Sequence, residues 1–196
     1  EQVELRNGHA FAGDASIPLA EIARLAHQRS DMLADLGGFN LGESGSYDPG
    51  GTFSNACHAA IVEVDPDTGH VRIERYLVVE DAGRIINPLI ADGQVRGGVA
   101  QGIANALYEE VVYAEDGNIL TGSLADFTPP TCAEVPYIEI HHLETDSEAT
   151  ITRAKGLGEG GTIGAPAAIA NAISDALAYL GADVTEMPMT PRRVRR

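Results

Sequence analysis

The pattern of apolar residues predicts a buried helix in the C-terminal third of the chain. Ile169, Ile173, Leu177 and Leu180 recur at helical spacing. Pro166 fits the first turn of such a helix, where a missing N–H group leaves no hydrogen bond unmade. We therefore expect the helix to begin close to Pro166 and to bury one apolar face.

A second helix is predicted over Asp92–Tyr108, because its apolar and polar residues separate onto two faces. Glycine inside a helix costs about 0.5–1 kcal/mol relative to alanine, and this segment has four glycines. A close approach by a ligand or by backbone would explain that cost, and so would glycines that ease helix–strand packing. The expected core face holds Val99, Ile103, Ala106 and Leu107, and the opposite stripe holds Gln94, Gly98, Gln101 and Asn105.

Strands are predicted where β-branched and aromatic residues flank short turn sequences. Asp65–Gly69 has the residues of a tight turn and lies between two apolar runs, so we expect a hairpin that continues to Asp81. The dipeptide Asp116-Gly117 indicates a second hairpin. A further strand is expected over Tyr137–Leu143.

The first fifty residues are less distinctive. Ser16–Ala26 is predicted to form a short helix with Ser16 as its N-cap. Gly37–Asn55 has six glycines and is expected to form a long connection over a partner or a channel. Strands and helices do not alternate in βαβ order, so the predicted fold class is α+β, with hairpins and packed helices. We expect one domain over 1–196, in which 1–50 forms an N-terminal extension.

Composition and charge argue against several classes of protein. With 196 residues, 44% of them hydrophobic and 21% charged, the chain is typical of a globular domain with its own core. Its formal net charge of −16 argues against nucleic-acid binding. No apolar run approaches the roughly 20 residues of a membrane span and no signal peptide opens the chain, so a cytoplasmic protein is expected. Cys57 and Cys132 lack metal-ligand spacing and are interpreted as small buried hydrophobes.

Three histidines are the remaining candidates for metal binding. His58 shares a strand face with Val62 and Val64, so we interpret it as a packed, hydrogen-bonded side chain. His141 and His142 are adjacent on a predicted strand and point to opposite faces, so they cannot chelate one metal ion. No metal-ligating side chain is therefore predicted.

A glycine-rich segment precedes the C-terminal helix and holds a single carboxylate. Glycine lets a ligand approach without a Cβ in the way, so Glu159 is interpreted as an acid held where a large ligand could reach it. A solvated glutamate on a glycine-rich connection is the alternative. A dinucleotide-binding fingerprint fits poorly, because the preceding Glu144–Arg153 is polar rather than an apolar strand. The segment has the sequence Lys155-Gly-Leu-Gly-Glu-Gly-Gly-Thr-Ile-Gly-Ala-Pro166.

Three further segments occur with this loop in the order found in a known family. They are Asp81-Ala-Gly-Arg-Ile-Ile-Asn-Pro88, Asp92-Gly-Gln-Val-Arg-Gly-Gly-Val-Ala-Gln-Gly102 and Leu124-Ala-Asp-Phe-Thr-Pro-Pro-Thr131. Together they resemble the molybdenum-binding large subunit of the xanthine dehydrogenase, aldehyde oxidase and carbon monoxide dehydrogenase family. The resemblance covers residues 50 to 191 and implies the fold of a molybdenum-cofactor-binding domain.

The resemblance implies a molybdenum hydroxylase, which oxidatively hydroxylates a carbon centre. By motif position the family's general base, which lies beside the molybdenum-bound oxygen, falls on Glu159. The substrate stays open among aldehydes, purines and other N-heterocycles, and carbon monoxide. Electrons are expected to leave through iron–sulfur clusters to flavin.

The resemblance also implies which residues face the cofactor. Gln94 and Gln101 are expected on the cofactor side of their helix. The backbone N–H groups at Gly156 and Gly158 are expected to hold oxygens of the cofactor or substrate. Lys155 is expected either to serve an anionic part of the cofactor or to be solvated.

The implied cofactor is a molybdenum–pterin, in the molybdopterin cytosine dinucleotide form. [2Fe–2S] clusters and FAD are expected on partner subunits or domains rather than on this chain. The expected partners are the upstream half of the molybdenum subunit and iron–sulfur and flavin subunits, assembled as an oligomer. The isolated chain is expected to be inactive.

The chain departs from the family pattern at two positions and in its extent. The family often has glycine at the position of Ala154 and tyrosine at that of Phe127, and neither change removes a group that the mechanism needs. The chain also lacks the Gly-Gln-Gly-type loops of the upstream half, so it resembles the C-terminal portion only. Because it begins at Glu1 without methionine, we expect an excised or processed piece. Two alternatives stay open: a non-catalytic assembly module that packs against an upstream cofactor-binding domain, and an anion-binding domain, which the net charge disfavours.

Overall fold

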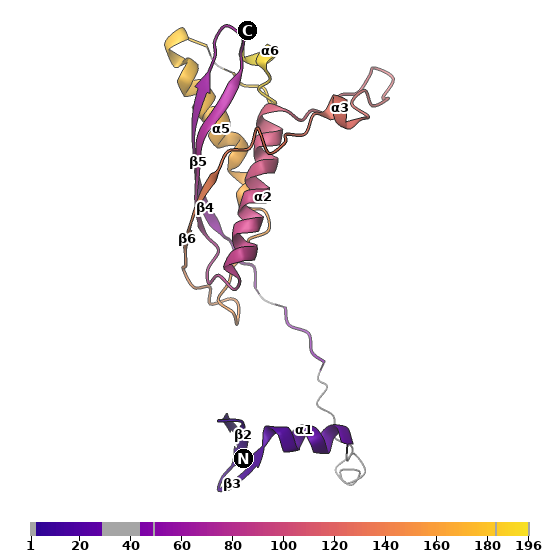
Figure 1. Cartoon of the computed structure of the whole chain (residues 1–196), viewed down its shortest axis with the longest axis vertical. Helices are drawn as coiled ribbons and strands as arrows, with labels where there is room; N and C mark the ends of the chain where they lie inside the picture. Colours follow the sequence, from indigo (N-terminus) through magenta and orange to yellow (C-terminus); the bar gives the residue numbers. More distant parts are fainter. Residues whose placement is uncertain (1–2, 29–43, 49, 183, 196) are drawn as a thin grey trace. The chain divides into compact units, whose positions relative to one another are not determined.

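Figure 1 shows a computed structural model of the chain, which describes residues 3–28, 44–48, 50–182 and 184–195. Its internal contacts divide the chain into two units, Glu1–Asp48 and Pro49–Arg196. Each unit is described by itself.

The first unit contains a small antiparallel sheet and one helix. The three strands pair in sequence order, and the helix follows directly after the last of them (Figure 1). The elements are β1 (Glu4–Arg6), β2 (His9–Ala12), β3 (Ala15–Pro18) and α1 (Leu19–Gln28).

The prediction of a helix over Ser16–Ala26 is wrong in its first turn. Ser16 does not cap a helix, because it pairs with Phe11 across the sheet, and α1 begins at Leu19. The strands of this unit are three or four residues long and mostly exposed, so no clear alternation of apolar and polar residues marks them in the sequence.

The expected long connection over Gly37–Asn55 spans the sequence boundary between the two units. Residues 37–43 and 49 lie outside the described residues, while 44–48 and 50–54 form neither helix nor strand. Asn55 is the first residue of a strand rather than the last residue of the connection.

The second unit is built on a sheet in which a long hairpin is extended by a parallel strand. β4 (Asn55–Val64) and β5 (Val71–Asp81) are antiparallel, and β6 (Ile138–Leu143) pairs parallel with β5. The N–H of Gly69 donates to the carbonyl oxygen of Asp65 at 2.7 Å and closes the turn between the first two strands. The predicted first hairpin and the predicted last strand are therefore confirmed.

Two helices cover one face of this sheet, namely α2 (Pro88–Leu107) and α5 (Ala165–Leu177). They pack against each other, and α5 also lies along β4 while α2 touches β6 (Figure 1). Inward-facing residues of β5 alternate with exposed or half-buried ones, as a strand with one covered face requires. Hairpins and packed helices confirm the predicted α+β class.

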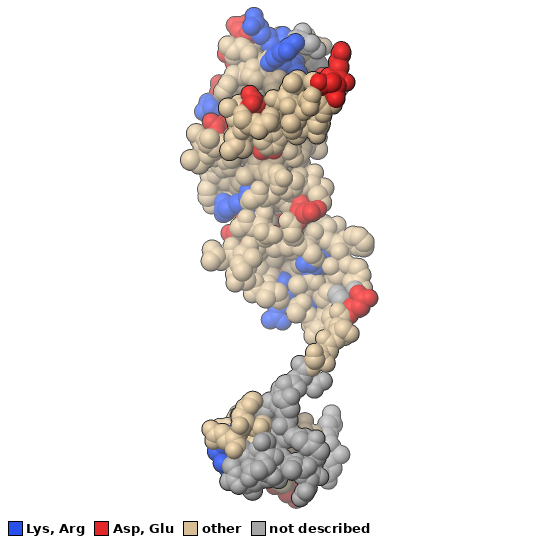
Figure 2. Space-filling model, turned by 90° about the vertical axis from the view of Figure 1, so that its right-hand side faces the viewer, with Lys and Arg blue, Asp and Glu red and all other residues tan. Residues whose placement is uncertain are grey.

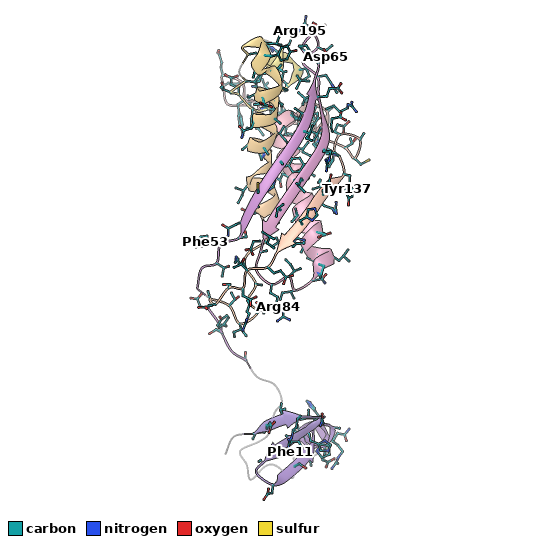
Figure 3. All side chains as sticks on the ribbon, turned by 90° about the vertical axis from the view of Figure 1, so that its left-hand side faces the viewer. Phe11, Phe53, Asp65, Arg84, Tyr137 and Arg195 are labelled. Carbon is teal, nitrogen blue, oxygen red and sulfur yellow. The ribbon has the colours of Figure 1, made fainter. Side chains whose placement is uncertain are left out.

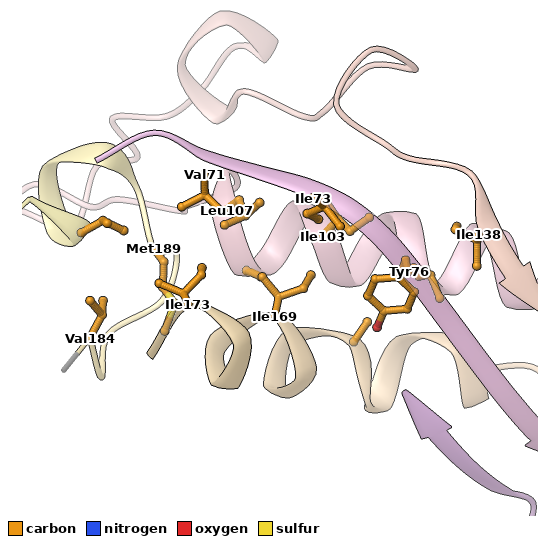
Figure 4. Close-up of a cluster of buried hydrophobic side chains, with 14 of the residues drawn as sticks. Val71, Ile73, Tyr76, Ile103, Leu107, Ile138, Ile169, Ile173, Val184 and Met189 are labelled. Atoms are coloured by element: carbon orange, nitrogen blue, oxygen red, sulfur yellow. The ribbon is translucent and has the colours of Figure 1, made fainter. Parts of the chain in front are cut away.

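The core lies between the covered face and the two helices (Figure 4). Burying one Val or Ile side chain contributes about 1.5–3 kcal/mol relative to leaving it in water, so this interface supplies much of the stability of the unit. Its most deeply buried apolar residues are Tyr76 and Val78 from β5, Val95, Val99 and Ile103 from α2, and Ile169 and Ile173 from α5.

The predicted C-terminal helix is confirmed through Leu177, which is buried, but not through Leu180. Leu180 belongs to the 3₁₀ helix η2 (Ala178–Leu180) and is 52% exposed. By length and hydropathy alone, Gly160–Leu180 would suffice for a membrane span. Its buried isoleucines pack into the core, and this packing accounts for its apolar character.

The helix predicted from Asp92 begins four residues earlier, at Pro88. The side chain of Asn87 caps it by accepting a hydrogen bond from the N–H of Ile90 at 3.3 Å, and proline is favoured at the first helical position. The extra turn was not predicted because Leu89 and Ile90 are exposed, which breaks the separation into two faces.

Three shorter helices complete the second unit: α3 (Leu124–Phe127), α4 (Gly160–Ile163) and α6 (Pro191–Val194). α3 lies on an extension between α2 and β6 that projects away from the sheet (Figure 1). The second predicted hairpin falls in this extension but consists of a single bridge between Tyr113 and Ile119. Both residues are exposed, and a hairpin without a face to bury is marginal in water.

The prediction of buried cysteines is wrong, because Cys57 and Cys132 are both exposed. Cys57 lies on β4 and directly precedes the inward-facing His58, so strand alternation places it on the uncovered face. Cys132 lies in the segment that leads from α3 to β6.

Candidate functional site

The glycine loop lies at the end of the sheet where β5 stops. Arg84 and Phe53 mark this end in Figure 3, whereas Asp65 and Arg195 lie at the opposite end. Gly83 and Ala154 form an antiparallel bridge. Beside this bridge, the N–H of Lys155 donates to the carbonyl oxygen of Ala82 at 2.7 Å. The structure thus joins two of the segments that the sequence analysis singled out.

An ion pair joins the beginning of the loop to the last residue of β5. Nζ of Lys155 lies 3.1 Å from Oδ1 of Asp81, and both side chains are largely buried. Hydrogen bonds from Thr145 above all, and also from Gly83 and Lys155, hold the pKa of the Asp81 carboxyl well below its usual range, against an opposing effect of burial. The charge of Lys155 is therefore paired within the chain rather than solvated.

Glu159 occupies the position just before the first turn of α4. Its carbonyl oxygen accepts hydrogen bonds from the N–H groups of Thr162 at 2.9 Å and Ile163 at 3.2 Å. Its side chain is exposed and makes no capping hydrogen bond. The backbone is thus fixed at this position while the carboxylate points into open space.

The loop on either side of Leu157 is open. The N–H of Gly156 donates to Oγ1 of Thr52 at 3.3 Å. A Cβ built on Gly156 or Gly158 would meet no atom within 4 Å. Neither glycine is required by packing inside the described chain, which leaves both free to face a bound molecule.

Helix α2 approaches α4 and the start of α5 closely because of two of its glycines. A Cβ on Gly98 would lie 2.8 Å from the backbone nitrogen of Thr162, and a Cβ on Gly102 would overlap that of Ala165. Oγ1 of Thr162 also donates to the carbonyl oxygen of Gly98 at 3.1 Å. Close approach of backbone therefore explains these two glycines, whereas Gly93 and Gly97 face open space.

Gln94 and Gln101 lie about one turn before and one turn after Gly98 on α2, and both are exposed. They therefore flank the point where the helix meets the loop turn. Between the start of α2, the end of β5 and the loop lies a largely apolar hollow of about 310 Å³. Its lining includes Ala82, Ile86, Ile90, Lys155 and Leu157.

Beneath the loop lie ionisable side chains that the sequence analysis did not assign to the site. Nδ1 of His58 is 2.9 Å from the hydroxyl of Tyr76, which confirms the interpretation of a packed, hydrogen-bonded histidine. Burial lowers the pKa of His58, partly offset by the nearby backbone of Gly160. Glu80 is completely buried, and burial raises the pKa of its carboxyl against an opposing effect of His142.

Glu80 went unnoticed because it directly precedes Asp81 in an acidic pair at a strand end. The signal that could have found it is strand alternation, since it shares the inward phase of Tyr76 and Val78. His142 lies beside Glu80 on β6, and its Nε2 is 2.9 Å from Oδ1 of Asp92. His141 on the same strand is exposed, so the two adjacent histidines do point apart as predicted.

The residues around the loop fit a molybdenum–pterin cofactor. An open glycine backbone and two exposed amides offer N–H donors to phosphate and pterin oxygens, while the hollow beside the loop is apolar. Among the described residues, no three His, Cys, Asp or Glu side chains are grouped so that they could hold a metal ion.

Basic side chains are dispersed on the face shown in Figure 2. On the face shown in Figure 2, uncharged residues dominate and the blue basic side chains form small separate groups. That face presents no continuous basic surface of the kind that nucleic-acid binding requires.

Comparisons with known proteins identify the family. Residues 1–136 match the model of the molybdopterin cofactor-binding domain. The chain is 50% identical over 144 residues to the nicotine 6-hydroxylase large subunit of Paenarthrobacter nicotinovorans, covering 74% of this chain and 18% of that protein. It is 38% identical over 143 residues to the carbon monoxide dehydrogenase large chain of Afipia carboxidovorans, covering 72% of this chain and 18% of that protein.

Among solved structures, quinoline 2-oxidoreductase from Pseudomonas putida 86 superimposes with a TM-score of 0.83 at 38% identity. The match covers 98% of this chain and 25% of that chain. The chain thus spans less than a fifth of the length of the curated relatives named above. It belongs to the molybdopterin cofactor-binding domain family, and the predicted resemblance to the molybdenum-binding large subunits of xanthine dehydrogenases, aldehyde oxidases and carbon monoxide dehydrogenases is confirmed.

Proposed function

We propose that this chain forms the C-terminal part of a molybdenum hydroxylase large subunit and that Glu159 is its general base. The observation that carries the proposal is the placement of one exposed carboxylate on a turn whose backbone is fixed to both β5 and α2. A general base must lie within about 2.6–3.2 Å of the proton that it removes. A rigid turn can hold the carboxylate at such a distance, whereas a mobile loop cannot.

The other residues around the loop serve to bind and orient the cofactor. The side-chain amides of Gln94 and Gln101 and the N–H of Gly158 are the donors that would hold it. Gly156, whose own N–H is bonded to Thr52, leaves space for it to approach. Lys155 acts through its ion pair with Asp81, which fixes the start of the loop. The cofactor, when bound, supplies the redox centre and the oxygen that is transferred. Glu159 accepts the proton at a carboxylate oxygen and releases it to water.

The cofactor form and the partners extend this proposal. We propose the cytosine dinucleotide form of the molybdenum–pterin, with [2Fe–2S] clusters and FAD on partner subunits of an oligomeric cytoplasmic complex. Relatives of this chain are named as the large subunit or the gamma subunit of an enzyme, which supports a multi-subunit assembly. The upstream part of the large subunit would complete the cofactor site.

An aromatic N-heterocycle is the substrate class that the comparisons favour. Relatives named for nicotine and quinoline are 50% and 38% identical to this chain. The relatives named for carbon monoxide are 38% and 34% identical. We therefore propose oxidative hydroxylation at a ring carbon beside nitrogen, where the carbon is electron-poor.

Cofactor content tests this proposal against the assembly-module alternative. We expect molybdenum and acid-released cytidine nucleotide each near one per complex when the chain is purified with its natural upstream partner. Molybdenum with a different nucleotide, or with none, would contradict the cofactor form only. An intact complex that holds neither, from a host that makes the cofactor, would contradict the proposal and support a non-catalytic assembly module.

A further inference from the structure

Four buried side-chain atoms lack a hydrogen-bond partner among the described residues, and all of them belong to three adjacent strands. They are Nε2 of His58 on β4, both carboxyl oxygens of Glu80 on β5 and Nδ1 of His142 on β6. Glu80 is paired in register with Ala56 on one side and with His142 on the other, and His58 is two residues along β4 from Ala56. The unpartnered atoms therefore share one end of the covered face. Buried polar atoms without partners are rare, and a concentration of them calls for a specific explanation.

This group of side chains lies directly beneath the turn that holds Glu159. A Cβ added to Gly160 would overlap Oε1 of Glu80. A Cβ added to Gly164, at the other end of α4, would lie 2.6 Å from Cδ2 of His58. The turn thus rests on Glu80 and His58, and both glycines are needed for it to come so close.

We propose that Glu80 is a positioning residue. Together with His58 and His142, it sets the position and orientation of the Glu159–Gly164 turn relative to the covered face of the sheet. The importance of that position for catalysis rests on the proposed function, but the contact between Glu80 and the turn does not. Glu80 does not touch the space above the loop, since it is completely buried. It acts through Gly160.

The surroundings of Glu80 favour its uncharged form. The titratable groups beside it are His142 on β6 and His58 on β4, and Asp92 of α2 contacts Nε2 of His142, while the Glu159 side chain on the turn is exposed. A protonated carboxyl both donates and accepts, so it can bond the histidines through one buried water with two to four polar partners. An ionised carboxylate there would be buried without a bonded cation, which is costly.

Hydrogen exchange of the assembled enzyme tests the proposal without relying on turnover. We compare wild type with Glu80→Gln, which preserves shape and both hydrogen-bonding roles, and with Glu80→Ala. The matched control is Glu74→Ala, which removes an exposed glutamate from the same strand. We expect amides 156–164 to exchange at least about tenfold faster in Glu80→Ala, through easier local opening. They should stay near wild type in Glu80→Gln and in the control. Unchanged exchange in Glu80→Ala would overturn the proposal.

Gly160→Ala provides a second perturbation in case Glu80→Ala fails to assemble. The added methyl group would overlap the Glu80 carboxyl, so the turn should shift and its amides should exchange faster. Glu80→Ala combined with Gly160→Ala should reverse most of that increase, because the shorter side chain makes room. If the double variant is not stable, the comparison of Glu80→Gln with Gly160→Ala tests the proposal by itself. Exchange as fast in Glu80→Gln as in Gly160→Ala would overturn the proposal.

Kinetics on the same variants separate this proposal from the proposed function. We expect Glu80→Ala to lower kcat more than it raises KM at unchanged molybdenum content, and Glu80→Gln to restore kcat. Faster exchange at 156–164 with unchanged kcat would support the contact between Glu80 and the turn, and it would contradict the role of Glu159 as base. A lower kcat without faster exchange at 156–164 would contradict the positioning role of Glu80.

Discussion

Glu80 and Glu159 show how burial divides the roles of two carboxyl groups at the single-residue scale. One side chain is completely buried on a strand and the other is exposed on a turn, although Gly160 places that turn directly against the Glu80 carboxyl. The buried group has a raised pKa and can donate a hydrogen bond, whereas the exposed group can meet a bound molecule. This division agrees with the two roles that we propose, structural support for Glu80 and proton transfer for Glu159.

The raised pKa of Glu80 predicts a specific pH dependence of folding stability. Because the folded-state pKa lies above the unfolded value of 4.5, the folded state binds more protons, and unfolding becomes easier as pH rises. The contribution of the protonated carboxyl should be complete below about pH 4.5 and lost as pH rises through the raised pKa. Thermal unfolding of the chain between pH 4 and 8 checks this. Glu80→Gln should flatten the slope relative to wild type.

The lowered pKa of His58 acts in the opposite direction and must be distinguished in the same experiment. Its destabilising effect grows as pH falls through its unfolded value of 6.5. A His58→Gln control should therefore change the slope of folding stability against pH on the acid side of that value. The change should have the opposite sign to that caused by Glu80→Gln. Identical slopes for Glu80→Gln and wild type would contradict a buried, protonated Glu80.

At the scale of elements, the crossing of α2 over α4 places the loop. Gly98 allows the backbones of α2 and α4 to meet where Thr162 bonds back to α2, and Gly102 makes room for Ala165 at the start of α5. The same crossing places the side chains of Gln94 and Gln101 beside the turn, since both residues flank the crossing and are exposed. A helix with larger residues at these two glycines would push the turn away from both amides.

A pair of glycine substitutions on α2 tests this account of the crossing. Gly102→Ala should destabilise the chain by about 1–3 kcal/mol, because its methyl group would be forced against Ala165. Gly97→Ala should stabilise it by about 0.5–1 kcal/mol, because that position is helical and open. Urea unfolding of both variants provides the measurement. Equal effects at the two positions would contradict a close approach specific to Gly102.

The sequence pattern predicted the elements that bury an apolar face, and it failed where burial does not follow periodicity. The isoleucines of α5, and Val99 and Ile103 of α2, recur at helical spacing and were placed correctly. The short exposed strands around Ser16 carry no such signal, and neither does the first turn of α2 with its exposed Leu89. Local capping by Asn87, rather than hydrophobicity, determines where that helix begins.

Part of the site could also be predicted. Glycines around Glu159 and the amide stripe of α2 are visible in sequence because glycine and glutamine are unusual in those settings. The buried group against which the turn packs could not be predicted from the sequence. Its members Glu80, His58 and His142 lie on three strands, and only the fold determines the register of these strands. The ion pair between Lys155 and Asp81 likewise joins residues that lie far apart in sequence.

At the scale of the whole molecule, the chain corresponds to a small part of its relatives. It spans about 18% of the curated relatives, and large apolar side chains remain exposed on its described surface. Ile86, Leu89 and Ile90 gather at the start of α2, beside the apolar hollow. We expect the upstream part of the subunit to cover this region and to complete the cofactor site. That 1–196 forms a single domain within that subunit stays a prediction.

Turnover of Glu159→Gln in the complete enzyme tests the central claim most directly. Glutamine is nearly isosteric with glutamate but accepts no proton at neutral pH. We expect turnover to fall by at least about 10²-fold, the lower range for loss of a general base, while molybdenum content stays near wild type. Glu148→Gln, at another exposed glutamate, serves as the matched control and should retain full turnover. Wild-type turnover in Glu159→Gln, at full molybdenum content, would contradict the assignment of Glu159 as the base.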